Sequence, residues 1–372
     1  MKDSDILSTL TKGIAEYVCS LEDPLQAGHF FPSHSSLTHK IPVALGCSCF
    51  ALKTLYTVNE WENIPEQKRQ QWITYIKSFQ KKTIDMGQNY YEKNAFIDPV
   101  VIDYITHHPS RLGQIKRLFS NKPYFANRGR IIYAETKQAI ATLYQIGEKN
   151  DLPYTSFPTK TDDLYNHLLS LDWSIPWGAG GQAAAVAVFL TTQAPGFLKK
   201  DEMSALRSEM ISFFNKIADP TTGSYFIGRT PHHNQQVNGA MKVLTALDWL
   251  ESPIHYPDRL IDTCLSQVPI SDGCHLVDDV YVLYRCHRET GYRDTEIREH
   301  CMKLLENIQN HKKSDGGFSY FTAHTQTSYY GVPLPREYGI SDIHGTCLLT
   351  WALSMIMEIL DLNENNWNVI KP

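Results

Sequence analysis

The sequence lacks the features that are typical of membrane-spanning, secreted and nucleic-acid-binding proteins. No apolar run approaches the length of a membrane span, and the N-terminus, Met1-Lys2-Asp3-Ser4-Asp5, lacks the order of a secretory signal. A basic stripe with interleaved aromatic residues is absent, and the net charge is −5. We therefore expect a cytoplasmic protein with no stable membrane span and no nucleic-acid partner.

The motifs that commonly hold metals or phosphates are also missing. The eight cysteines form no CxxC pair, and the adjacent His232 and His233 lack the spacing at which one helix chelates a metal. The glycine-rich segment 177–181 lacks the Lys-Ser/Thr of a phosphate loop. The sequence thus predicts no metal site and no cofactor, and we expect reduced cysteines that pack as small apolar residues.

Helical patterns dominate what is present. Six segments combine apolar positions with Ala, Gly, Ser, Thr or Cys, which lets neighbouring helices approach closely on more than one side. These predicted inner helices span residues 41–56, 130–146, 177–190, 235–250, 275–286 and 341–359. Six further segments have one apolar stripe and a charged face, as surface helices do. These predicted outer helices span residues 3–21, 66–86, 160–171, 200–217, 257–268 and 292–311.

Inner and outer helices alternate, with no convincing run of strands. This order predicts an all-α fold, an (α/α)6 toroid of six inner and six outer helices, in a single domain over residues 1–372 with an insertion around 87–127. An open helical bundle or solenoid would give the same helical hairpins, because periodicity does not report whether a chain closes into a ring.

Two turns carry a resemblance to known proteins. Asp219-Pro220-Thr221-Thr222-Gly223-Ser224-Tyr225-Phe226 and Asp315-Gly316-Gly317-Phe318-Ser319-Tyr320-Phe321 both place glycine before an aromatic residue. In these turns the sequence resembles the terpenoid-cyclase and protein-prenyltransferase superfamily. That resemblance implies an α/α toroid that handles isoprenoids.

Two helix starts extend this resemblance and also depart from it. In the segment 275–281, Asp278 matches a zinc-binding Asp of prenyltransferases, but Val280 replaces the Cys ligand. In the segment 341–347, Gly345 occupies the position of the zinc-binding His. A prenyltransferase-type zinc site is therefore incomplete. Compared with the DxDD box of class II terpene cyclases, Asp278 matches the proton donor and Leu276 replaces the first Asp.

Polar residues near the starts of the inner helices are the candidate functional residues, because these helix ends converge in a toroid. The candidate catalytic residues are Asp278, Asp279, His344 and Asn238. The candidate substrate-binding residues are Trp177, Tyr281, Arg285, Glu135, His233, Tyr338 and Gln182. Asp278 and Asp279 could equally cap their helix, and His233 could be solvated or bonded within its loop.

Three functions remain open. The preferred one is an isoprenoid-handling enzyme in which Asp278 acts as a general acid and starts a cyclisation, with aromatic residues stabilising a carbocation. The first alternative is a carbohydrate-active toroid, either a uronate polysaccharide lyase or a glycoside hydrolase that pairs Glu135 with Asp278. The second alternative is a toroid that binds a ligand without catalysis. The expected partner is a small molecule or an oligosaccharide.

Overall fold

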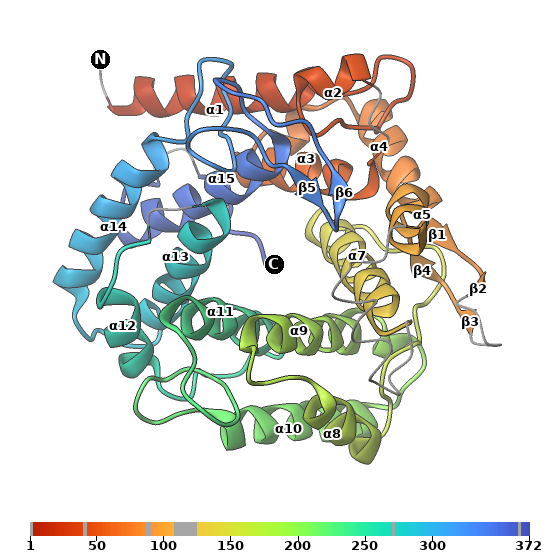
Figure 1. Cartoon of the computed structure of the whole chain (residues 1–372), viewed down its shortest axis with the longest axis vertical. Helices are drawn as coiled ribbons and strands as arrows, with labels where there is room; N and C mark the ends of the chain where they lie inside the picture. Colours follow the sequence, from red (N-terminus) through yellow and green to blue (C-terminus); the bar gives the residue numbers. More distant parts are fainter. Residues whose placement is uncertain (1–2, 40–42, 86–90, 108–124, 270–271, 364–365) are drawn as a thin grey trace.

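The computed structural model describes the chain except residues 1–2, 40–42, 86–90, 108–124, 270–271 and 364–365. Helices make up most of the described part, and they form a ring around an open centre (Figure 1). The inner helices are α3 (Leu45–Thr57), α7 (Phe125–Gln145), α9 (Pro176–Thr192), α11 (His233–Trp249), α13 (Gly273–His287) and α15 (Ile343–Ile359). Each packs against the next, and α15 packs against α3. The ring is therefore closed, which confirms the predicted toroid.

The remaining helices lie mostly outside this ring (Figure 1). They are α1 (Asp3–Ser20), α2 (His34–His39), α4 (Glu66–Ser78), α5 (Pro99–His107), α8 (Thr161–Ser170), α10 (Lys200–Ile217), α12 (Pro257–Leu265) and α14 (Asp294–Gln309), with short 3-10 helices at Trp61–Asn63 and Ala194–Gly196. In the described residues, no helix is both long and apolar enough to cross a membrane. All eight cysteines are free thiols, as expected.

In the part of the chain that the structure describes, strands form three short antiparallel pairs. They join β1 (Gln80–Lys81) to β4 (Ala95–Phe96), β2 (Ile84–Asp85) to β3 (Tyr91–Glu92), and β5 (Ser328–Tyr329) to β6 (Val332–Pro333). The helix predicted for residues 66–86 ends at Ser78, because the chain beyond it pairs with β4, a distant segment that periodicity does not reveal. Much of the predicted insertion, residues 87–90 and 108–124, lies outside the described residues.

Small residues let α9 and α11 pack closely enough to place a lysine over the centre of the ring. A Cβ added to Gly180 would lie 2.9 Å from Cβ of Lys242 and 3.2 Å from the carbonyl oxygen of Gly239. A Cβ added to Gly239 would lie 2.6 Å from Cβ of Pro176, the first residue of α9. Proline is favoured at this helix position because its missing N–H would have no partner there.

Aspartate side chains cap the starts of α13 and α15. The carboxylate of Asp272 accepts a hydrogen bond from His275 N at 3.0 Å and thus caps α13. Asp342 caps α15 by accepting from Gly345 N at 2.7 Å, and it also accepts from Tyr320 N of the preceding loop. Desolvation raises the pKa of the Asp342 carboxyl to about 6 despite these bonds. Asp278 and Asp279 lie one turn inside α13, so they do not cap it.

Candidate functional site

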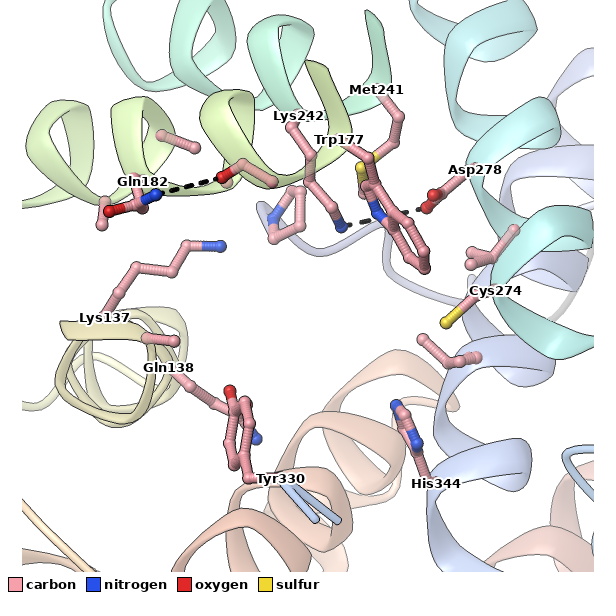
Figure 2. Close-up of a pocket in the computed structure, with 18 of the residues that line it drawn as sticks. Lys137, Gln138, Trp177, Gln182, Met241, Lys242, Cys274, Asp278, Tyr330 and His344 are labelled. Carbon is pink, nitrogen blue, oxygen red and sulfur yellow. Dashed lines mark hydrogen bonds and ion pairs between the residues drawn. The ribbon is translucent and has the colours of Figure 1, made fainter. Parts of the chain in front are cut away.

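A cavity of about 680 Å³ lies at the centre of the ring. Every inner helix contributes to its wall, and so do the turn between β5 and β6 and residues near the C-terminus. This volume falls within the range of small-molecule sites, and convergence of six helices on one space is what a closed toroid provides. Figure 2 shows the side chains that point into the cavity.

The cavity wall carries an excess of positive charge. Lys53 comes from α3, Arg130 and Lys137 from α7, and Lys242 from α11. Burial lowers the pKa of the Lys53 ammonium. The pKa of Lys137 lies well below its usual value, because burial disfavours the charged form and Lys53 and Lys242 repel a further cation. Lys137 is therefore the cavity residue most easily held as a neutral amine.

Asp278 is the only side-chain carboxylate in the wall of this cavity among the described residues. Its Oδ1 lies 3.9 Å from Lys242 Nζ across the gap between α13 and α11 (Figure 2). Its other carboxylate oxygen is buried without a hydrogen-bond partner. Desolvation raises the pKa of Asp278 to about 6, and Lys242 and His275 limit the rise by attraction.

This raised pKa predicts how the stability of an Asp278→Asn variant changes with pH. Because the folded chain binds this proton more tightly than the unfolded chain, the stabilisation is present below pH 3.8 and is lost as pH rises through about 6. The free energy of unfolding of the variant, relative to wild type, should rise by about 2 kcal/mol between about pH 4 and pH 7. Denaturant unfolding at several pH values measures this, and a constant difference would contradict it.

Aromatic side chains form another part of the wall. The ring of His344 stacks on Phe50, with centroids 4.4 Å apart, and on Tyr320 at 5.2 Å. Burial lowers the pKa of His344 to about 3, with a contribution from Lys242, so this ring is neutral at physiological pH. Trp177 and Trp351 also line the cavity. These flat surfaces suit a ligand with an apolar face as well as charge.

Tyr330 enters the cavity from the turn between β5 and β6. Its backbone is left-handed, with φ of 47°, and Gly331 follows with φ of 90°. The left-handed region is disfavoured for a bulky residue, and such strain often marks a functional position. The neighbouring Tyr329 is held against α3, where a Cβ added to Gly46 would overlap its ring. The hairpin thus directs Tyr330 toward Gln138 and the centre of the ring (Figure 2).

The candidate residues from the sequence fall into several places. Asp278, His344, Trp177 and Gln182 line the central cavity together. Asn238, His233 and Asp279 instead line a smaller pocket of about 190 Å³ between α11 and α13. There Asn238 Nδ2 lies 2.9 Å from His275 Nδ1, and the Asp279 carboxylate lies 2.9 Å from His300 Nε2.

The other four candidates lie outside the central cavity. Arg285 pairs with Asp248 at 3.1 Å and bonds the Tyr281 hydroxyl, so these two residues join α13 to α11. Glu135 is buried and accepts a hydrogen bond from Asp98 N at 3.1 Å. Burial raises the pKa of its carboxyl well above the usual value, and nearby Asp98 adds to the rise. Tyr338 is 68% exposed and contacts His324.

Sequence reasoning missed Lys53, Lys242 and Tyr330. A lysine in the middle of a predicted inner helix was a usable signal, because such a residue faces neighbouring helices instead of water. The tyrosine-glycine pair at 330–331 looked like an ordinary loop, and nothing nearby in sequence links it to the ring.

No protein-family model matches the chain, and no curated protein is similar to it. Among solved structures, a polysaccharide lyase is similar, with a TM-score of 0.44 and 11% identity over 96% of this chain and 98% of that chain. A likeness this distant assigns no residue role.

The preferred functional prediction, an isoprenoid-handling cyclase, is wrong. The solved structure found to be similar is that of a polysaccharide lyase and not of an isoprenoid cyclase. The cavity supplies the physical reason. Besides Lys137, three basic side chains line it, and their positive charge would repel a carbocation rather than stabilise one. Asp278, the single side-chain carboxylate that the described residues place in this wall, already lies beside Lys242.

Proposed function

We propose that this chain binds an acidic oligosaccharide in its central cavity and cleaves it by β-elimination, as a uronate polysaccharide lyase does. The observation that carries the proposal is the charge of the wall: Lys53, Arg130, Lys137 and Lys242 face one space that holds a single side-chain carboxylate. Even with Lys137 neutral, the other three basic side chains outnumber this carboxylate, and their positive charge favours an anionic ligand.

Elimination requires three tasks at the reacting sugar. A base removes the proton on the carbon beside the carboxylate, and that electron pair forms a carbon–carbon double bond while the bond to the glycosidic oxygen breaks. A cation stabilises the negative charge that builds on the carboxylate, and an acid gives a proton to the departing oxygen. No water is consumed, so the product carries a double bond.

The cavity residues suit these tasks. Lys137 is the base, because its lowered pKa leaves a neutral amine able to accept a proton. Lys242 stabilises the carboxylate, since its Nζ reaches over the cavity and Asp278 holds it there. The Tyr330 hydroxyl, at the cavity edge near Gln138, donates the proton to the leaving oxygen (Figure 2). Aromatic walls such as Trp177 contact the sugar rings.

Two other functions find less support. A glycoside hydrolase needs two carboxyl groups across one bond, but Glu135 does not line the cavity that Asp278 lines. A toroid that binds without catalysis would share the cationic wall. A lysine with a strongly lowered pKa favours chemistry over binding alone, because neutral amines are poor anion ligands.

The test is a screen of the purified protein against polygalacturonate, alginate, glucuronan and hyaluronan. We expect at least one of them to yield products with the ultraviolet absorbance of an unsaturated uronate. The same polymer with its carboxylates reduced to alcohols should not be cleaved. New reducing ends without that absorbance would indicate a hydrolase, and binding without any product would leave a non-catalytic toroid. Either result would overturn the lyase assignment.

A further inference from the structure

The last residues of the chain cross the ring at one face. We call residues 366–372 the C-terminal strap. Asn368 bonds the carbonyl oxygens of Tyr56 and Thr57 at the end of α3, at 2.8 and 2.7 Å. Lys371 N donates to Gln145 Oε1 at the end of α7, at 3.0 Å. The strap therefore spans the C-terminal ends of neighbouring inner helices.

The strap is also fastened to a third inner helix and to an outer one. Trp249, the last residue of α11, donates its indole N–H to the carbonyl oxygen of Pro372 at 3.0 Å. The Lys371 ammonium lies 5.7 Å from the centre of the Trp249 ring. Trp367 is 2% exposed, and its indole N–H donates to Thr11 of α1 at 2.9 Å. A segment anchored at so many points is part of the folded core.

Two strap residues line the central cavity. Ile370, which is 3% exposed, and Pro372 both contribute to its wall. The wall residues Trp177 of α9 and Cys274 of α13 come from the first turns of their helices, and Ala184 and Ala185 lie further along α9. The cavity thus runs from the N-terminal ends of the inner helices toward a floor made by the strap. In Figure 1 the C-terminus lies inside the ring.

We propose that the strap closes one end of the cavity, which makes it a blind pocket. The enzyme therefore cleaves its polymer from a chain end. This inference rests on the proposed lyase function. A polymer can be cut internally only if it extends past the reacting sugar in both directions. With Ile370 and Pro372 across the far end, only a terminal stretch of sugars fits, and each cleavage releases a short product of fixed length.

The experiment compares wild type with a variant that lacks residues 369–372 and with Lys371→Ala. The deletion keeps Trp367 and Asn368 but removes both cavity-lining residues. Lys371→Ala is the matched control, because the bond from its backbone N–H to Gln145 remains. Each enzyme is given the polymer it cleaves best, and the fall in polymer length is measured against the number of double bonds formed.

We expect wild type and Lys371→Ala to release one short product while the polymer length falls slowly. The deletion variant should give mixed lengths, with a severalfold larger fall in length per double bond. Rapid internal cutting by wild type would overturn the proposal, as would an unchanged pattern in a folded deletion variant. If the deletion variant does not fold, the double variant Gln145→Ala/Trp249→Phe is tested in its place. This double variant removes two of the hydrogen bonds that hold the strap.

A failure of the lyase function itself would look different. In that case no double bonds form from any polymer with any of the three enzymes. The blind cavity is then judged by calorimetry with polygalacturonate chains of one length. Binding of about one protein per chain end supports a floor, and binding of many proteins along each chain by wild type overturns it.

Discussion

Replacing Lys137 by glutamine should lower kcat/KM for eliminative cleavage by about a thousandfold, the scale on which general-base catalysis acts. Glutamine keeps length and polarity but does not accept the proton. The fold should persist, because the change replaces a neutral amine beside Lys53 and Lys242 by a neutral amide. The production of unsaturated sugar measures activity, and thermal unfolding monitors the fold.

Lys137→Arg separates the role of base from that of charge. Arginine stays protonated at all accessible pH values, so this variant should be as inactive as Lys137→Gln even though it places a positive charge in the cavity. Wild-type kcat should also fall as pH drops through the lowered pKa of Lys137, because the amine is then protonated. An active Lys137→Arg enzyme would show that this residue supplies charge alone.

Replacing Lys242 by methionine should lower kcat by about a hundredfold or more, as loss of one preorganised charge does elsewhere. The negative charge on the substrate carboxylate grows in the transition state, so kcat should fall more than KM rises. The pKa of Asp278 should also rise further, because Lys242 is the attraction that limits it. Steady-state kinetics measure the first effect, and titration of the carboxyl by NMR measures the second.

Two control variants test whether the effect of Lys242→Met comes from the lost charge in the cavity. Lys242→Arg keeps the charge beside Asp278 and should retain most of the activity. Lys216→Met removes an exposed lysine of α10 that lies over Tyr165 of α8, outside the cavity, and should leave kcat unchanged. If Lys242→Met raised KM alone, Lys242 would contribute to substrate binding and not to the transition state.

Most of the helices could be predicted from the sequence, because each has a local pattern, but α2 and α5 were not predicted. The outer helix predicted for residues 200–217 has those bounds in the structure. The inner helix predicted for 235–250 begins only two residues earlier and ends one residue earlier. The helix predicted for 66–86 was too long, since its last part pairs with residues 95–96, and pairing between distant segments leaves no periodic signal.

The site could be predicted only in part. Asp278, His344, Trp177 and Gln182 were candidates because they lie near helix starts, and the ring does bring them together. Tyr281 and Arg285 are on the same helix as Asp278, yet they point to Asp248 of α11. Side chains about one helical turn apart on α13 thus face either the cavity or α11. The orientation of α13 in the ring determines which side chains face the cavity.

The amino-acid order by itself determined most of the helices, their alternation and the small residues that let them pack closely. These depend on neighbours within a few positions along the chain. Closure of the ring, the gathering of Lys53, Lys137 and Lys242 around one cavity, and the floor made by Ile370 were decided only by the tertiary structure. Electrostatic repulsion and burial act between atoms close in space, and those atoms come from helices far apart in sequence.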